Sequence, residues 1–404
     1  MLPAHSLPRR ILPVSITAFT ATSAVGVGKE RMLAAVAESR SGLRPNDFGP
    51  EPLATWIGRV DGLEPPLPAS LARWDCRNHR LAWLGLNADG FLDAAIDARR
   101  RFGAARVAVI VGTSTSSIAA TEDAYRVLDA EGRFPPALRD TRLHTLHSLA
   151  HFVQHALGLE GPCLTVSTAC SSSAKVFAAA ERMLRADLID AAVVGGADSL
   201  CGSTLFGFNA LQLVSPEPCR PFDAHRRGIN LGEAAGFALL ERSGRGEQGP
   251  LQLIGHGESS DAHHMSAPHP EGLGAERALG DALARAGIDA DAVDHINLHG
   301  TASQKNDEVE AALVARRFGP RVHASSTKGL TGHTLGSAGI VEAAFSLLAI
   351  ETGLMPGTAN SESLDAACGP QIRLRPAQGE VRVALSNSFG FGGSNCVLVF
   401  ASAD

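Results

Sequence analysis

Short apolar runs alternate with longer amphipathic stretches along much of the chain. Runs rich in Val, Ile and Ala predict strands that are buried on both faces. The predicted strands are Val107–Val111, Leu164–Val166, Ala191–Val194, Val293–Leu298, Val381–Leu385 and Cys396–Phe400. Apolar residues at helical spacing predict helices over Leu146–Leu157, Val176–Leu184, Val309–Phe318 and Ile340–Ile350. This alternation predicts an α/β fold.

The pattern also indicates two related halves. A polar, Gly-rich segment, Ser243–Pro250, is the most linker-like stretch in the middle of the chain. We therefore expect a first half over residues 1–245 and a second over 251–404. Thr165–Leu184 and Ser325–Leu348 both run from a strand end through small residues into an apolar helix, which suggests a duplication. A chain of 404 residues with 45% hydrophobic content can bury a large core in this way.

The N-terminal region admits two interpretations. Arg9-Arg10 followed by apolar residues has some features of an export signal. Polar residues interrupt the apolar part, however, and Ser15–Thr20 alternates as a strand does, so we expect a first core strand. No run approaches the roughly 18 apolar residues of a membrane span. These features predict a cytoplasmic protein with no membrane span.

Charge and cysteine content narrow the classes of function. The net charge is −6, and no basic tail is present, which argues against general nucleic-acid binding. A local basic patch would still suffice to bind an acidic protein. Seven cysteines without regular spacing suggest reduced thiols rather than a disulfide framework. We interpret six of them as packing residues: Cys76, Cys163, Cys201, Cys219, Cys368 and Cys396.

Cys170 is the candidate nucleophile. It follows the predicted strand Leu164–Val166 and precedes a predicted helix, with small residues on either side. The unpaired N–H groups and the positive dipole end of a helix N-terminus favour a thiolate, the nucleophilic form of cysteine. The alternative is a buried structural cysteine, which is the commoner role for a lone Cys.

Two histidines also lie where elements begin or end. Asn297 and His299 share one face of a predicted strand, and His299 opens a sharp turn at its carboxyl end, where α/β sheets place ligands. His333 lies in a Gly-rich approach to the helix that begins near Ile340. Either histidine alone is more typical of an ordinary core or surface residue. Together with Cys170, the two imidazoles could converge on one reactive site.

Glu342 lies in a helix that is apolar on nearly every face, so its carboxylate should be buried and should require a partner. Lys328 is the leading candidate, and Asp307 and Glu310 complete a plausible ionic cluster. This cluster could orient His333, or it could be purely structural, and the two roles are compatible.

A Gly-rich segment, Ser386–Asn395, lies between the last two predicted strands. It is not a dinucleotide-binding loop, because no helix follows it. A hairpin that presents a backbone N–H and two phenylalanines fits better. A zinc site from His256, His263, His264 and His269 is conceivable, but their spacing is irregular and no cysteine joins them. We therefore expect no metal.

Several motifs together resemble those of the type I and type II β-ketoacyl-acyl carrier protein synthases. They occur in the family's order and extend over nearly the whole chain. The motifs are Thr168-Ala-Cys170-Ser-Ser, His299-Gly-Thr301, Lys328…Gly332-His333 and Asn387-Ser-Phe-Gly-Phe-Gly-Gly393, with Gly195-Gly-Ala-Asp198, Arg220-Pro-Phe-Asp223, Gly232-Glu-Ala-Ala-Gly236 and Ser259-Ser-Asp-Ala-His263 between them. Gly232-Glu-Ala-Ala-Gly236 lacks a second glycine that is common there.

The resemblance implies a thiolase-like layered fold (α-β-α-β-α) of two similar halves, usually assembled as a dimer. It implies that Cys170 accepts an acyl chain as a thioester. His299 and His333 would then assist decarboxylation of a malonyl carrier and stabilise the enolate. The backbone N–H groups of Cys170 and Phe391 would form the oxyanion hole, with Phe391 also a gate. Lys328, Glu342 and Asp307 would support the site, and no metal or organic cofactor is implied.

Neighbouring families differ at identifiable residues. Type III synthases use a Cys-His-Asn arrangement, whereas the third position here is His333. Thiolases use a second cysteine in a late Gly-rich loop, and Cys396 lies beyond that loop, inside a predicted strand. Chain-length factors are non-catalytic partners of the same fold and commonly lack the nucleophilic cysteine. The presence of Cys170 with both histidines favours a catalyst over a chain-length-factor-like subunit.

The motifs indicate the substrate and the partner proteins less directly than they indicate the reaction. Trp74–Leu86 and Ser173-Ala-Lys175 look like the synthases of aryl polyene and xanthomonadin-type pigment pathways, with fatty-acid synthesis as the alternative. The implied partners are acyl carrier protein, in acyl and malonyl forms, and a second copy or a related subunit. We expect the acidic carrier to dock on Arg73, Arg77 and Arg80. The alternative is that these arginines are solvated surface charges.

Overall fold

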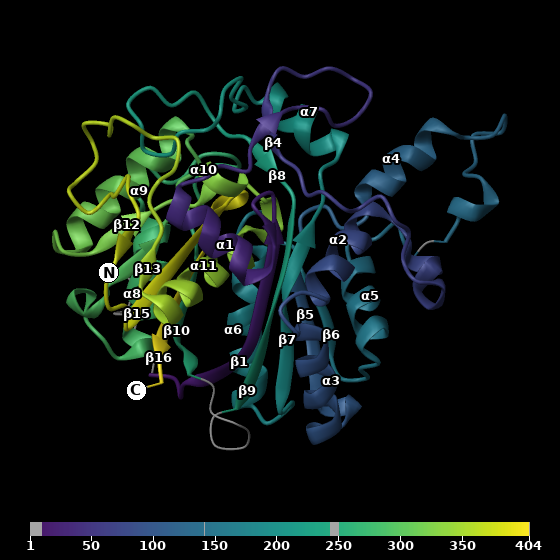
Figure 1. Cartoon of the computed structure of the whole chain (residues 1–404), viewed down its shortest axis with the longest axis horizontal. Helices are drawn as coiled ribbons and strands as arrows, with labels where there is room; N and C mark the ends of the chain where they lie inside the picture. The colour runs from purple at the N-terminus through teal and green to yellow at the C-terminus, as the bar shows by residue number, and fades with distance from the viewer. Residues whose placement is uncertain (1–9, 141, 243–249, 404) are drawn as a thin grey trace.

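A computed structural model describes residues 10–140, 142–242 and 250–403 (Figure 1). The strands are β1 (Val14–Ser23), β2 (Gly26–Val27), β3 (Arg44–Pro45), β4 (Trp56–Gly58), β5 (Val107–Gly112), β6 (Cys163–Val166), β7 (Ala191–Asp198), β8 (Leu231–Gly232), β9 (Ala234–Arg242), β10 (Leu251–Ser260), β11 (His295–Asn297), β12 (His323–Ser325), β13 (Leu354–Met355), β14 (Ala377–Gln378), β15 (Val383–Gly390) and β16 (Ser394–Ser402). The α-helices are α1 (Gly28–Glu38), α2 (Arg77–Leu86), α3 (Phe91–Phe102), α4 (Ile118–Arg126), α5 (Ser148–Leu157), α6 (Ser172–Arg185), α7 (Gly202–Ala210), α8 (Leu273–Ala286), α9 (Gln304–Arg317), α10 (Lys328–Thr331) and α11 (Ala338–Thr352).

The large sheet repeats one arrangement twice. From its centre, one half runs β1-β9-β7-β5-β6 and the other runs β10-β16-β15-β11-β12. In each half the first two pairings are antiparallel and the last two are parallel. The halves join where Val14–Ile16 pairs with Leu251–Leu253. Identical order and direction confirm the prediction of two similar halves.

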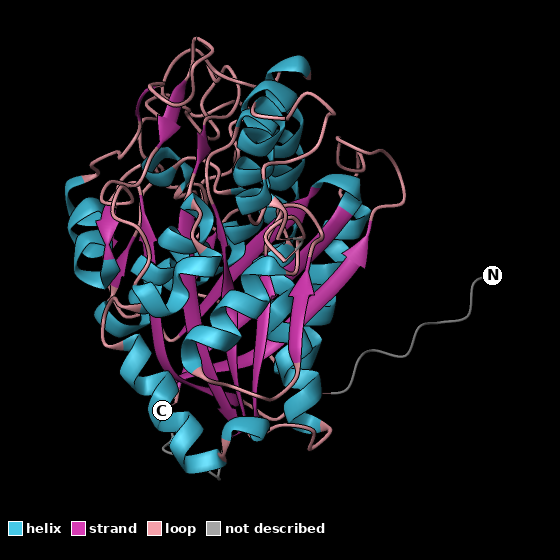
Figure 2. Cartoon of the chain, turned by 90° about the vertical axis from the view of Figure 1, so that its right-hand side faces the viewer, coloured by secondary structure: helices cyan, strands magenta, loops and turns pink. Residues whose placement is uncertain are grey.

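The helices and half-sheets form five layers. Helices α6 and α11 lie at the centre, where Phe177 and Phe345 share one core cluster with residues from both half-sheets. The outer face of the N-terminal half-sheet packs on α2, α3 and α5, and that of the C-terminal half-sheet packs on α8 and α9. Figure 2 shows the strands inside the molecule with helices around them. This confirms the predicted α-β-α-β-α order.

The two central helices are preceded by similar turns. Ala169, three residues before α6, has φ 52°, and Leu335, three residues before α11, has φ 55°. Positive φ is costly for residues with a Cβ, so the surrounding packing must hold both turns in place. The turn before α6 carries Cys170, and the turn before α11 follows His333.

The predicted strands and helices all occur, with different ends. Strand β15 runs five residues beyond the predicted end at Leu385, and β11 is shorter than Val293–Leu298. Strands β9 and β10 were not predicted, because their Ala and Gly content weakens the strand signal. The predicted first strand, Ser15–Thr20, lies within β1. Apart from Pro250, the predicted linker lies outside the described residues, as does Arg9 of the Arg9-Arg10 pair.

In the described part of the chain, one helical stretch, Leu335–Thr352, is long and apolar enough to cross a membrane by length and composition alone. This stretch was not expected from the sequence. It is 83% buried inside the protein because it contains the central helix α11. Its apolar character is therefore explained by its position between the two half-sheets.

Candidate active site

Cys170 lies on the turn between β6 and the N-terminus of α6, and only 5% of it is exposed. This burial raises the pKa of its thiol to about 11. Lys328 and the backbone N–H of Phe391 lower the pKa, but by less than burial raises it. This direction is opposite to the thiolate that a helix N-terminus favours, and burial is its largest cause. Cys170 rests as a thiol.

Both predicted histidines lie beside this thiol. Cys170 Sγ is 3.0 Å from His333 Nε2, in hydrogen-bond contact. The rings of His299 and His333 are nearly perpendicular, with centroids 5.5 Å apart. One side-chain N or S atom from each of the three residues lies within 4.8 Å of the others. The structure thus brings the thiol together with two imidazoles that lie 129 and 163 positions after it in the chain.

Lys328 fixes the chemical state of His299. Its Nζ donates to the carbonyl oxygen of His299 at 2.5 Å and lies 3.4 Å from His299 Nδ1. Because an ammonium group only donates, Nδ1 must accept, and the ring proton resides on Nε2. Burial first, and then Lys328, hold the pKa of both His299 and His333 well below the ordinary value. Both rings are neutral, so His299 presents an N–H donor.

Glu342 supplies the charge partner of Lys328, as predicted. The two groups form a buried ion pair. Burial raises the pKa of Glu342 to about 7, and Lys328 acts in the opposite direction. The other carboxylate oxygen of Glu342 has no hydrogen-bond partner. The pair therefore holds the ammonium group against His299 and leaves one acceptor free.

Glu310, rather than Asp307, supports His299 directly. Glu310 accepts the backbone N–H groups of His299 and Gly300, each at 2.8 Å. Asp307 instead accepts the backbone N–H of Phe222 at 2.7 Å and lies 3.8 Å from Arg226. Burial raises the pKa of Asp307 to about 6. The predicted ionic cluster is thus two separate groups. Glu310 contacts the turn at His299, whereas Asp307 contacts Phe222 and Arg226.

The β15–β16 hairpin carries Phe391 to the thiol, as the Gly-rich pattern suggested. The Phe391 N–H is hydrogen-bonded to the Cys170 sulfur. A Cβ on Gly390 would lie 2.9 Å from the carbonyl oxygen of Thr168 and 3.2 Å from Cys170 N, so the approach requires glycine. The Phe391 ring packs on Phe208 of α7, with centroids 5.4 Å apart.

A cavity of about 280 Å³ opens beside the thiol. Cys170, His299, His333 and Phe391 line it, together with an apolar wall formed by Phe208, Leu211, Leu213 and Ile229. Lys305, whose side chain is 77% exposed, also lines it. Sequence reasoning did not select the apolar wall or Lys305, because they follow no motif. The cavity can place a thioester against the thiol and both rings.

The three predicted docking arginines do not line this cavity. Arg77 forms an ion pair with buried Glu233, and its side chain is 19% exposed. Arg80 pairs with Asp75 and also donates to two backbone carbonyls. Arg73 is exposed and lies over the ring of Trp74. Arg77 and Arg80 therefore hold the fold together locally, and Arg73 is the exposed arginine of the three.

The four histidines considered for zinc do not form a ligand group in the described residues. His256 is buried and bonds to Glu181 of α6. The rings of His263 and His269 lie 5.1 Å apart, and His264 bonds to Ser266.

Comparison with known proteins assigns the family. Models of the β-ketoacyl synthase N-terminal and C-terminal domains match residues 78–245 and 252–362. Nodulation protein E of Rhizobium meliloti (strain 1021) is 36% identical over 323 residues, which cover 76% of this chain and 80% of that protein. The chain belongs to the β-ketoacyl synthase family.

Other relatives agree with this β-ketoacyl synthase assignment. The 3-oxoacyl-[acyl-carrier-protein] synthase 2 of Rhizobium meliloti (strain 1021) is 38% identical over 311 residues, covering 72% of this chain and 73% of that enzyme. A ketosynthase (ApeO) solved in complex with its chain length factor (ApeC), from Xenorhabdus doucetiae, is similar with a TM-score of 0.87 and 35% identity. That match covers 97% of this chain and 98% of the other. The chain is thus a thiolase-like condensing enzyme, an acyltransferase.

Proposed function

We propose that this β-ketoacyl synthase catalyses a decarboxylative Claisen condensation, in which an acyl chain on Cys170 is extended by two carbons from malonyl-acyl carrier protein. The 3.0 Å contact between Cys170 Sγ and His333 Nε2 carries the proposal. It places a proton acceptor on a thiol that lines an apolar cavity. The reaction needs no cofactor, because loss of CO₂ itself generates the carbanion.

In the first step, the acyl group moves from its carrier to Cys170. The thiol proton passes to His333 Nε2 as sulfur attacks the thioester carbonyl. The tetrahedral intermediate collapses by breaking the bond to the carrier sulfur, and His333 returns the proton to that sulfur. The products are acyl-Cys170 and a free carrier thiol, with His333 again neutral.

In the second step, malonyl carrier loses CO₂ and leaves an enolate. The ring N–H of His299, held on Nε2 by Lys328, donates to the enolate oxygen. Once Cys170 is acylated, its sulfur no longer donates to His333, so this ring can also carry its proton on Nε2 and donate. The enolate carbon attacks the acyl-Cys170 carbonyl, the carbon–sulfur bond breaks, and one proton from solvent restores the thiol.

Two backbone N–H groups would stabilise both tetrahedral intermediates. The Phe391 N–H is hydrogen-bonded to the Cys170 sulfur. The Cys170 N–H lies beside Gly390, the residue before Phe391 on the β15–β16 hairpin. An oxyanion between them would replace the present contact to sulfur. The Phe391 ring, half-buried on Phe208, would act as the gate between the acyl wall and the side that admits malonyl carrier.

Acyl carrier protein is the proposed substrate carrier. Lys305 is the exposed cation at the cavity, and Arg73 is the exposed arginine of the predicted docking set. We expect Lys305→Glu to raise KM for acyl-carrier while leaving kcat with a small acyl thioester unchanged, because an acidic carrier is repelled but a neutral thioester is not. Arg73→Glu provides the second variant. Equal losses with both substrates would contradict docking at these positions.

The proposed second subunit is another copy of the chain or a related chain. The ketosynthase from Xenorhabdus doucetiae is in complex with its chain length factor, and the ishigamide ketosynthase/chain length factor is 28% identical to this chain. We propose a cytoplasmic assembly that works in aryl polyene-type or fatty-acid synthesis. The segments Trp74–Leu86 and Ser173–Lys175 support the first pathway by resemblance.

Incubation with a panel of acyl-carriers, followed by intact-mass measurement, tests the proposal. We expect one acyl adduct per chain, its absence in Cys170→Ala, and a β-ketoacyl product on the carrier after malonyl-carrier is added. Preference for conjugated or aryl chains would favour pigment assembly, whereas saturated chains would favour fatty-acid synthesis. If no carrier gives an adduct, the chain is a non-catalytic, chain-length-factor-like subunit and the proposal is wrong.

A further inference from the structure

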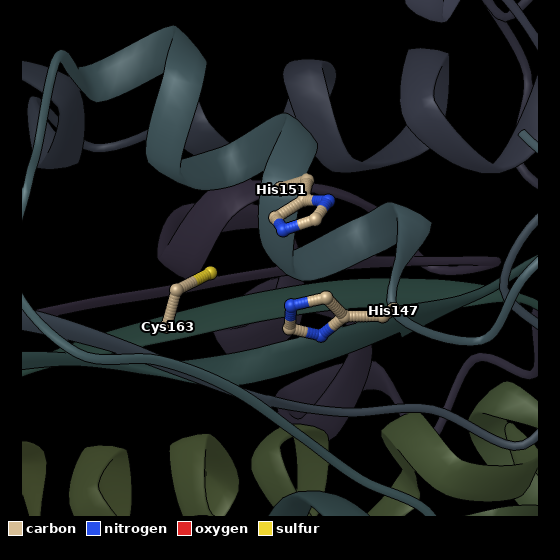
Figure 3. A group of neighbouring side chains, drawn as sticks. All are labelled: His147, His151 and Cys163. Atoms are coloured by element: carbon tan, nitrogen blue, oxygen red, sulfur yellow. The ribbon is translucent and has the colours of Figure 1, made fainter. Parts of the chain in front are cut away.

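A second cluster of nitrogen and sulfur ligand atoms lies apart from the catalytic cavity. His147, His151 and Cys163 each offer one ligand atom, and these atoms lie within 4.8 Å of one another. None of the three residues lines the cavity beside Cys170. Figure 3 shows the Cys163 side chain pointing toward the two imidazole rings, which come from the N-terminal turns of α5. We call these three residues the edge cluster, because Cys163 begins the edge strand β6.

Regular backbone geometry produces the edge cluster. His147 is the N-cap of α5, and His151 follows it by four residues, so both side chains lie on one face of the helix. Side chains alternate along a strand, so Cys163 and Thr165 share one face of β6. Helix α5 packs on β6. The helix face and the strand face therefore meet.

One imidazole of the edge cluster is already oriented as in known metal sites. His147 Nδ1 lies 2.8 Å from Thr165 Oγ1. When Nδ1–H donates to this hydroxyl, Nε2 keeps a free lone pair, and Figure 3 shows a ring nitrogen of His147 directed toward Cys163 and His151. Metal-bound histidines typically hold their second nitrogen in such a hydrogen bond. The two rings lie 4.1 Å apart between centroids, close enough to share one ion.

We propose that the edge cluster binds one zinc ion through His147, His151 and Cys163, with water as the fourth ligand. Two imidazoles and a thiolate form a donor set that suits Zn²⁺, and the absence of carboxylates disfavours Mg²⁺ and Ca²⁺. Binding releases the thiol proton to solvent. In the single chain His151 is exposed, and His147 and Cys163 are half-buried.

The bound ion would connect α5 to β6, the strand that leads to Cys170. Cys163 also packs against the core of the N-terminal half, as its interpretation as a packing residue expected, and the proposal gives it a second role. Spacing along the sequence could not reveal the site, because 12 positions separate Cys163 from His151 and only the fold brings them together. The site is independent of the catalytic proposal.

Cobalt provides a direct spectroscopic test. Cys170 with His299 and His333 is a competing ligand group, so the full-length chain should carry Cys170→Ala. Titration with Co²⁺ should give a thiolate-to-cobalt charge-transfer band and the visible bands of tetrahedral Co²⁺, saturating at one ion per chain. Zn²⁺ should abolish both. Absence of the thiolate band in this folded variant would overturn the proposal.

Further substitutions in the same background locate the site. His151→Ala and Cys163→Ser should each remove the charge-transfer band, and His151→Ala should weaken Zn²⁺ binding by at least about tenfold. The matched control is His155→Ala, which removes an exposed histidine one turn further along α5 that is not part of the cluster. Circular dichroism should show that all variants are folded. A charge-transfer band that survives Cys163→Ser would place the metal elsewhere and contradict the assignment.

Discussion

At the residue scale, the proton of Cys170 is subject to opposing influences. Burial raises the thiol pKa to about 11, while Lys328 and the Phe391 N–H lower it. Burial also lowers the pKa of His333, the proposed acceptor of the thiol proton. The neutral thiol–imidazole pair is therefore the resting state, and the nucleophile forms only as the proton moves during attack.

This resting state predicts the pH dependence of alkylation. A thiol pKa raised from 9.0 to about 11 means that the thiolate fraction is small at neutral pH and grows as the pH rises. The rate of iodoacetamide addition to Cys170 should increase about tenfold per pH unit between roughly pH 7 and 9. Intact-mass measurement follows the reaction, with Cys170→Ala reporting the background from the other cysteines. A plateau below pH 8 would instead indicate a thiolate–imidazolium pair.

Substitutions in the buried pair Lys328–Glu342 should affect stability and catalytic activity differently. Glu342→Ala should cost about 3–5 kcal/mol in the free energy of unfolding, because it leaves a buried ammonium group without a countercharge. The double variant Lys328→Met, Glu342→Leu should recover most of that loss in a urea titration. Its condensation activity should remain low, since the donor that sets the His299 tautomer is gone. Full activity in the double variant would contradict the positioning role of Lys328.

The sequence predicted which residues form the site better than it predicted their protonation and contacts. The positions of Cys170, His299 and His333 at the ends of elements indicated one shared site, and the apolar surroundings of Glu342 indicated burial. The protonation of Cys170 was not predictable, because desolvation depends on side chains from several elements at once. The division between Glu310 and Asp307 was hidden for the same reason: both lie on α9, and only the packed structure shows which one contacts the turn at His299.

At the element scale, the β15–β16 hairpin of the C-terminal half reaches the turn of the N-terminal half that carries Cys170. The Gly-rich pattern predicted this hairpin, but not that β15 continues to Gly390 as a paired strand. Pairing up to the tip holds the backbone N–H of Phe391 in place. The missing side chain of Gly390 allows the tip to reach the turn that carries Cys170.

Gly390→Ala should therefore impair catalysis more than stability. The added methyl group would lie 2.9 Å from the carbonyl oxygen of Thr168, so the hairpin tip must shift and move the Phe391 N–H away from the oxyanion position. We expect kcat to fall by about 10²-fold, the typical effect of losing one oxyanion donor. Gly280→Ala in α8, where a Cβ meets open space, is the control. Similar kcat values for both variants would contradict the proposed role of Phe391.

At the scale of the whole molecule, the two ends of the large sheet differ. Beyond β12, Ala324 forms a bridge with Ile372, which partly covers that edge. Strand β6 ends the path on the other side, and Leu164 on it is 43% exposed. Uncovered edge strands are templates for pairing with another chain. The proposed second subunit therefore fits best at β6.

Leu164→Asp should convert the assembly into monomers, because a charge on the edge strand opposes strand pairing across an apolar contact. Sedimentation velocity would show a change from dimer to monomer. Leu188→Asp is the matched control, since Leu188 is also an exposed leucine (58%) but lies outside the strands. An unchanged sedimentation coefficient for Leu164→Asp would exclude β6 as the interface.

The duplication was visible in the sequence only as a faint likeness between Thr165–Leu184 and Ser325–Leu348. The pairing order shows it in full, because strand direction and order persist where side chains have diverged. Strands β9 and β10, which the pattern missed, are the ones that complete the repeat at the centre of the sheet. Weak local preference there is compensated by pairing on both sides.

The similar turns at Ala169 and Leu335 differ in the residue that follows. That residue, two positions before the central helix, is Cys170 in one half and Gly336 in the other. A side chain at Gly336 would meet Ser114 N at 2.5 Å and the Asp198 carboxylate at 2.7 Å. One half therefore carries a reactive group at this position, while the other has no room for a side chain and supplies both histidines. A nucleophile at position 336 would clash with Ser114 and Asp198, so packing fixes the asymmetry of this enzyme.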